Sequence, residues 1–169
     1  MMQKLEKHSA IQTAPVRISR VFPAPRAIVF KAWSMTEHVK RWFAPEGYTV
    51  PHARVHMHIG GPFEVCMRAP DGVEHWTRGT FADVVPVERL VLDLYCEDAS
   101  GRRLFGAYTE VSFAEVNDGT RMDVVQTYSV IDPDAAWMVG GAPQGWAQTL
   151  DKLTSEVTRM QGEGASLKG

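Results

Sequence analysis

The sequence predicts an α+β fold in which a curved antiparallel β-sheet, two short helices and a long C-terminal helix enclose a cavity. Two short segments with helical apolar spacing come first, and a series of segments with an apolar period of two follows them. Turn sequences separate these segments, which indicates an antiparallel meander rather than a βαβ sheet. The chain then carries an apolar stripe at three- and four-residue steps, which is typical of an amphipathic helix.

The composition is that of one globular domain. The chain has 169 residues, of which 44% are hydrophobic and 22% charged, and its formal net charge is -2. Because the charge is nearly balanced, we expect no nucleic-acid partner and no anionic membrane surface as a partner. No apolar run approaches the roughly 20 residues that span a bilayer.

The domain limits are predicted from the position of the periodic segments. We expect residues 1–15 to form a flexible N-terminal tail, because they lack both periodicity and the apolar core of a secretory signal. The domain is expected to span 16–161, and the small residues of 162–169 to form a second tail. Cys66 and Cys96 show no metal-binding or redox spacing, which favours reduced thiols and a cytoplasmic location.

The first elements are a strand and two helices. Residues 16–22 are predicted as a strand that Pro23 and Pro25 end, because proline cannot donate a hydrogen bond to a β-ladder. Residues 26–33 and 36–43 carry apolar side chains at helical spacing, which predicts two short helices. Such short helices bury little by themselves and are suited to closing the end of a larger element.

From Val50 onward the apolar period is two, which predicts strands with one buried face. The first of these segments, 50–59, places His52, His56 and His58 on its polar face. Further strands are predicted at 63–68, 74–85, 90–96, 105–116 and 122–128. The pattern does not assign an inward face to 74–85, because Gly79 interrupts its alternation.

The C-terminal helix is predicted to begin at Asp132, a capping residue followed by proline in the first turn. Its apolar stripe consists of Ala135, Val139, Ala142, Trp146, Leu150, Leu153, Val157 and Met160. Gly140, Gly141 and Pro143 predict a bend in this helix, since an interior proline removes a hydrogen bond. The first half of the stripe is small and the second half is large, so we expect a cavity near Gly140.

Several short motifs occur in a fixed order along roughly 140 residues. They are Ile18 to Pro25, Phe30-Lys31-Ala32-Trp33, Lys40-Arg41-Trp42-Phe43, Gly60-Gly61-Pro62-Phe63, Pro70-Asp71-Gly72, Val85 to Val91, Asp118-Gly119-Thr120-Arg121, Gly145-Trp146 and Leu150-Asp151-Lys152-Leu153. Together they resemble the activator of heat shock protein 90 ATPase homologue-like (AHSA) family of the START/SRPBCC superfamily. The resemblance implies the helix-grip fold with β-α-α-β6-α order. The family often has an acid and an arginine before its Gly-Gly turn, where this chain has His56 and His58.

Inward-facing side chains of the strands and the small half of the stripe are the candidate ligand-binding residues. They are Met57, Met67, Thr109, Phe113, Gln126, Tyr128, Ala142 and Trp146. Methionine adapts to ligands of varied shape, and a few polar groups in an apolar cavity orient a ligand. Thr109, Gln126 and Tyr128 are equally consistent with a satisfied buried hydrogen-bond network.

The chain shows no pattern that requires a metal, a cofactor or a catalytic centre. His52, His56 and His58 can in principle bind zinc or nickel, but tetrahedral sites usually take ligands from more than one element. We therefore expect a solvated strand face there, no metal and no cofactor. No Ser-His-Asp order, paired carboxylates or histidine base is found on the candidate inner faces, so a binding protein is favoured over an enzyme.

Three functions follow from these observations. The favoured one is binding of a small hydrophobic or aromatic ligand in the cavity between sheet and helix. The resemblance alone implies a second, a chaperone-associated interaction protein, because members of the family act as co-chaperones. The third is an enzyme that acts on a hydrophobic substrate, and a homodimer is left open for each.

Overall fold

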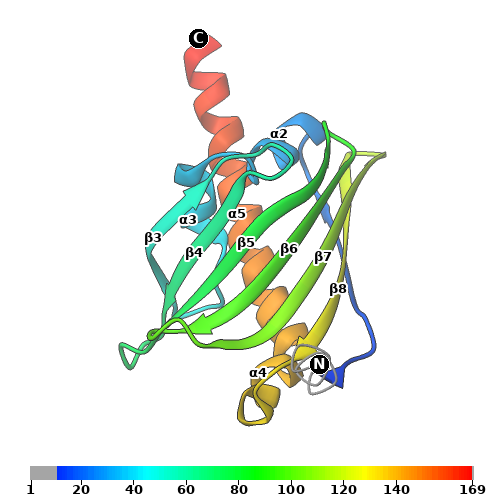
Figure 1. The fold of residues 1–169 in the computed structure, drawn as a ribbon. Coiled ribbons are helices and arrows are strands. Elements are labelled where there is room, and N and C mark those ends of the chain that lie inside the picture. Colours follow the sequence, from blue (N-terminus) through cyan, green and yellow to red (C-terminus); the bar gives the residue numbers. More distant parts are fainter. Residues whose placement is uncertain (1–10, 169) are drawn as a thin grey trace.

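The computed structural model describes residues 11–168, with side chains described for 11–163. In Figure 1 a curved sheet wraps around one long helix, and short helices close the ends. In chain order the elements are β1 (Ile11–Gln12), β2 (Val16–Phe22), α2 (Arg26–Lys31), α3 (Thr36–Trp42), β3 (Thr49–Val55), β4 (Pro62–Arg68), β5 (Glu74–Val85), β6 (Arg89–Asp98), β7 (Arg103–Val116), β8 (Gly119–Val130), the 3-10 turn η1 (Pro133–Ala135), α4 (Ala136–Gly140) and α5 (Ala142–Lys168). The predicted α+β helix-grip architecture is confirmed.

The sheet is antiparallel at every pairing and follows the order β1-β8-β7-β6-β5-β4-β3, with β2 also paired to β8. Strands β3 to β8 are joined by successive hairpins, as the turn sequences predict. The pairing of β2 with β8 places an N-terminal strand beside the last strand of the meander, with Val16 opposite Gln126. The sheet is thereby extended past β8 by a strand from the start of the chain.

Two of the predicted domain limits differ from the structure. Residues 11–12, expected in the N-terminal tail, form β1 with Ile11 opposite Val130, and the rest of that tail up to residue 10 lies outside the described residues. Residues 162–168, expected to form a C-terminal tail, continue α5. Because glycine costs only about 1 kcal/mol within a helix, the glycines of this segment do not stop a helix that is already formed.

The strand predicted over 50–59 is shorter than expected. It ends at Val55, His56 makes an isolated bridge with Met35, and His58 lies in the following turn. Ile59, expected to face inward, is 65% exposed. The alternation of polar and apolar residues continues past the strand, so the pattern alone could not show where pairing stops.

Helix α5 supplies the core with the large half of the predicted stripe. Leu150, Leu153 and Val157 are fully buried, and burial of such side chains contributes about 1.5–3 kcal/mol each. The predicted bend is present as a break, because α4 ends at Gly140 and α5 begins at Ala142. Among residues 11–168, no helix is both long enough and apolar enough to cross a membrane.

Helices α2 and α3 close one end of the sheet with aromatic side chains. The rings of Trp33 and Trp42 meet edge to face with centroids 4.7 Å apart, and Trp42 Nε1 donates to the Ala32 carbonyl at 3.0 Å. Phe43 continues the cluster to Phe63 on β4, at 5.0 Å. Aromatic side chains therefore fill this end of the interior.

Candidate functional site

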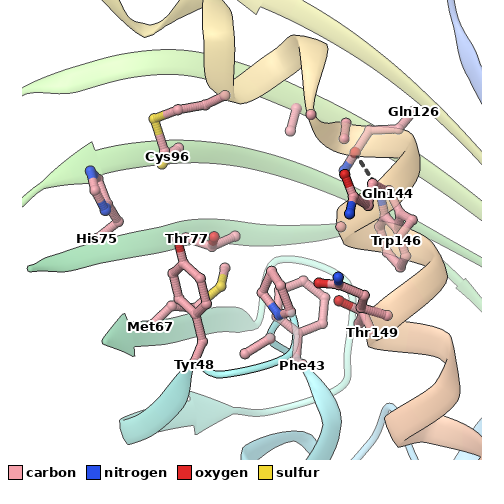
Figure 2. A pocket seen from close by; sticks show the side chains of 18 of the residues that line it. Phe43, Tyr48, Met67, His75, Thr77, Cys96, Gln126, Gln144, Trp146 and Thr149 are labelled. Atoms are coloured by element: carbon pink, nitrogen blue, oxygen red, sulfur yellow. Dashed lines mark hydrogen bonds between the residues drawn. The ribbon is translucent and has the colours of Figure 1, made fainter. Parts of the chain in front are cut away.

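A cavity of about 360 Å³ lies between the concave face of the sheet, the loop that follows α3, and the break between α4 and α5. Figure 2 shows side chains from all three parts converging on it. Its lining residues are Phe43, Ala44, Pro45, Tyr48, Met67, His75, Thr77, Leu94, Cys96, Phe105, Ala107, Gln126, Tyr128, Trp137, Met138, Gly141, Ala142, Gln144, Gly145, Trp146, Gln148 and Thr149.

The sheet wall is built by strand alternation. Alternate residues of a strand share one face, so a strand that crosses the cavity presents two side chains separated by one residue. The four central contributions follow this rule: His75 and Thr77 on β5, Leu94 and Cys96 on β6, Phe105 and Ala107 on β7, and Gln126 and Tyr128 on β8. The wall is therefore mostly apolar, with polar groups at its two sides.

Small residues leave space in the part of the helix wall next to the break. Gly141, Ala142 and Gly145 line the cavity at the start of α5, where the stripe predicts free space. Ala135, also in the small half of the stripe, instead packs with Cys96 and Leu104 in a separate apolar cluster. Small residues at the helix break thus leave room that leucines occupy farther along α5.

Gln126 is the centre of a buried hydrogen-bond network. Its Nε2 donates to Thr109 Oγ1 at 2.7 Å, while its Oε1 accepts from Trp146 Nε1 at 2.8 Å and from the Tyr128 hydroxyl. Thr109 Oγ1 in turn donates to the Ala107 carbonyl at 3.2 Å. The network ties β7, β8 and α5 together, and it fixes the indole of Trp146 at the edge of the cavity.

Five of the predicted site residues line the cavity, namely Met67, Gln126, Tyr128, Ala142 and Trp146. Three others do not. Thr109 lies behind Gln126, and Phe113 faces inward but packs edge to face against Phe30 of α2, with centroids 5.5 Å apart. Met57 packs against the core beyond the end of β3. All three side chains are buried or partly buried, as the alternation indicates. Periodicity does not encode how far along a strand the cavity lies, so it could not show that they miss the lining.

Sequence reasoning missed the polar side chains His75, Thr77 and Tyr48. His75 and Thr77 belong to β5, whose inward face was unassigned because of Gly79. A β-carbon at Gly79 would stand 1.9 Å from the Asp93 carbonyl oxygen, so a close approach of β6 accounts for the glycine. The expectation that the inner faces lack a histidine was therefore wrong. The sequence did contain a signal. His75, Thr77 and Phe81 are an even number of positions apart and so share one face of the strand, and the apolar Phe81 indicates that this face is the inward one.

Aspartate, glutamate, lysine and arginine are all missing from the lining residues. Burial raises the pKa of Cys96 to about 12 and the pKa of Tyr128 to about 12. Both groups consequently hold their protons at neutral pH, and Cys96 is a poor nucleophile.

Lys152 of α5 holds the loop that follows α3 by hydrogen bonds to its backbone. Lys152 Nζ donates to the carbonyl oxygens of Pro45 and Tyr48, at 2.9 and 3.2 Å. Burial lowers the pKa of Lys152. Since Phe43, Pro45 and Tyr48 all belong to one wall, these bonds hold that wall in place without a ligand.

The three histidines of the β3 region lie on the exposed side of the chain. His52 stacks on Trp76 with the rings 5° from parallel and 6.1 Å apart, whereas His56 and His58 lie beyond the strand. Within the described part of the chain, no group of three or more histidine, cysteine or acidic side chains is arranged to hold a metal ion. None of the three lines the cavity.

The family model described as "Activator of Hsp90 ATPase homolog 1-like protein" matches residues 23–158, which include every strand from β3 to β8 and most of α5. The chain belongs to this AHSA1 family. The resemblance inferred from the ordered motifs is confirmed. No curated protein matches the AHSA1 chain.

Solved structures of similar fold come from several bacteria. An uncharacterized protein from Rhizobium leguminosarum is 28% identical, with a TM-score of 0.76 over 88% of the AHSA1 chain and 99% of its own. A protein from Chromobacterium violaceum is 25% identical, with a TM-score of 0.70 over 85% and 96%. The AHSA1 protein from Silicibacter pomeroyi is 21% identical, with a TM-score of 0.73 over 87% and 99%, and supports the fold alone.

Proposed function

We propose that the protein binds a small hydrophobic or aromatic molecule in the cavity between the sheet and α5. The observation that carries the proposal is the preformed cavity of about 360 Å³, lined mainly by apolar and aromatic side chains with few polar groups. Cavities of this size and character are typical of small-molecule sites. The volume is enough for a ligand of up to three aromatic rings.

The aromatic lining favours a planar ligand. Phe43 and Trp146 stand perpendicular to each other, at 89° with centroids 6.2 Å apart, so a flat ring can stack on one and meet the edge of the other. Met67 and Met138 line the same cavity and can adjust to different ring substituents. Because the walls are held by Lys152 and by the Gln126 network, little ordering is left to oppose binding.

A neutral fluorescent probe such as N-phenyl-1-naphthylamine tests this function. We expect a dissociation constant in the micromolar range, about -8 kcal/mol, with a change in Trp146 fluorescence. Ala142→Trp places an indole in the cavity and should abolish binding. Ala147→Trp puts the same side chain on an exposed α5 position and is the matched control.

Failure of the probe to bind to the wild-type protein, or equal binding to Ala142→Trp, would contradict the proposal. Far-UV circular dichroism of both variants establishes that the fold is intact. The competing proposal, a chaperone partner by family analogy, predicts stimulation of an Hsp90 ATPase that Ala142→Trp leaves unchanged. The third proposal, an enzyme, would need His75 to act without an acidic or basic partner in the cavity lining.

A further inference from the structure

Two sets of polar groups in the cavity differ in their existing partners. Gln126, Tyr128 and Trp146 are bonded to one another and have little capacity left for a ligand. The side chains of His75, Thr77 and Tyr48 line the same cavity and make no hydrogen bond with the described residues. A ligand group that needs a hydrogen-bond partner finds three of them on the second set, while Gln144 and Thr149 offer two more on the helix wall.

The second set forms one polar corner, defined here as His75, Thr77 and Tyr48. His75 and Thr77 project from the same face of β5, about 7 Å apart along the strand. Figure 2 shows the ring of Tyr48 reaching from the loop toward the strand that carries Thr77. The corner lies across the cavity from the Gln126 network, so the two polar sides are separated by the apolar walls of Phe105, Ala107 and Leu94.

The chemistry of the corner selects the functional group. A threonine and a tyrosine hydroxyl each donate and accept, and an imidazole nitrogen can do either. A hydroxyl group can use donors and acceptors together, and a carbonyl can use the donors. An ionised ligand is disfavoured, because no lysine or arginine lines the cavity to pair with an anion, and no acid is present to pair with a cation.

We propose that the ligand is an uncharged aromatic molecule that carries a hydroxyl or carbonyl group, a phenol or an aryl ketone in chemical class, and that the polar corner binds this group. The inference rests on the proposed function, because it concerns the ligand of the same cavity. The apolar walls contribute most of the affinity. The polar corner sets the orientation, and it distinguishes an oxygen-bearing ligand from its hydrocarbon analogue.

Three naphthalene probes at pH 7 separate these contributions. 2-Naphthol is uncharged and has the hydroxyl, naphthalene lacks it, and 2-naphthoate carries a negative charge. We expect 2-naphthol to bind more tightly than both others. Thr77→Val and Tyr48→Phe should each weaken 2-naphthol binding about three- to tenfold, the range that one neutral hydrogen bond produces, and leave naphthalene binding unchanged.

Thr80→Val is the matched control, because Thr80 lies on the same strand as Thr77 but is exposed and does not line the cavity. Calorimetry gives the dissociation constants, and the thermal midpoint of each variant shows that it is folded. If naphthalene and 2-naphthol bind equally, if the corner variants have no effect on 2-naphthol, or if 2-naphthoate binds best, the inference about the polar corner is wrong while the cavity function stands. If no probe binds to the wild-type protein, the proposed function itself fails.

Discussion

Gln126 shows how one side chain can satisfy several buried groups at once. Its amide presents an acceptor and a donor, and the structure uses both, toward Trp146 and Tyr128 on one side and Thr109 on the other. Gln126 is only 5% exposed, so these partners have no easy access to water. A buried donor without a partner costs about 1–3 kcal/mol, which makes the network sensitive to its centre.

Replacing Gln126 by leucine tests this sensitivity. We expect Gln126→Leu to lower the free energy of unfolding by roughly 2 kcal/mol or more, because two buried donors lose their acceptor. Thr109→Val removes one partner only and should cost less. Urea unfolding measures both variants, and a loss below about half a kcal/mol in Gln126→Leu would mean that water already serves these groups.

Buried Cys96 and Tyr128 make stability depend on alkaline pH. Desolvation raises their pKa values from 9.0 and 10.0 to about 12 in the folded protein. The unfolded chain therefore loses these protons first, and the stabilising contribution is complete below about pH 9 and falls as the pH rises toward about 12. The loss approaches 1.4 kcal/mol for each unit by which a pKa is raised.

Unfolding in urea between about pH 8 and pH 11 checks this linkage. The double variant Cys96→Ala, Tyr128→Phe should show a shallower decline of stability with pH than the wild-type protein. Tyr108→Phe removes a phenol that is 44% exposed and serves as the control, with an unchanged slope. Equal slopes for the wild-type protein and the double variant would contradict the prediction.

At the scale of elements, α3 and α5 are joined by a buried carboxylate. Glu156 is 3% exposed, and its oxygens lie 2.7 Å from His38 Nδ1 on α3 and 2.7 Å from Arg159 Nε and Nη2 on α5. Burial acts to raise the pKa of Glu156, but the hydrogen bonds from Arg159 and His38 outweigh it and lower the pKa below its ordinary range. The lowered pKa means that folding favours the charged form of this side chain.

Glu156→Gln should therefore destabilise the protein at neutral pH by about 1.5–3 kcal/mol, the usual contribution of hydrogen bonds to a charged group. The difference from the wild-type protein should shrink as the pH falls below the ordinary value of 4.5, because the carboxylate then takes up a proton in the unfolded chain while the folded protein still holds it charged. Glu163→Gln removes an exposed partner of Arg159 and is the control, with a small effect. A difference that stays constant down to acid pH would disprove the coupling.

The elements themselves were largely predictable from the sequence, and their contacts were not. The hairpin meander, both short helices and the α5 stripe follow from period and turn residues. The inward face of β5 was not assigned. Gly79 lies close to the Asp93 carbonyl and interrupts the alternation that would have placed His75 and Thr77 inward. Glu156 was missed for a similar reason, since a charged residue beside an apolar stripe is usually exposed, and the sequence does not show that His38 of α3 lies against it.

At the scale of the whole molecule, one apolar core links both helical layers to the sheet. Side chains from β2, α2, α3, α5 and all the long strands belong to a single cluster. This shared cluster couples the unfolding of the helices to that of the sheet. We therefore expect one cooperative transition, as is usual for a single domain of this size.

Two probes of different parts make that expectation testable. Far-UV circular dichroism follows the sheet and α5, and tryptophan fluorescence follows Trp33 and Trp42 in the helical layer and Trp146 beside the cavity. The two urea midpoints should coincide. Separate midpoints would show that α2 and α3 unfold independently of the sheet, against the single core described above.

The break at Gly141 has a consequence for how such a chain can change over evolution. Residues of α4 and the first turns of α5 face the cavity, while Leu150, Leu153 and Val157 farther along pack the core. Substitutions at exposed lining positions such as Trp137 and Gln144 can thus reshape the cavity at little cost in stability, whereas those at Leu150, Leu153 and Val157 are constrained by packing. Under the proposed binding function, the residues that contact a ligand and those that pack the core lie on successive stretches of α4 and α5, so the cavity can change while the fold is kept.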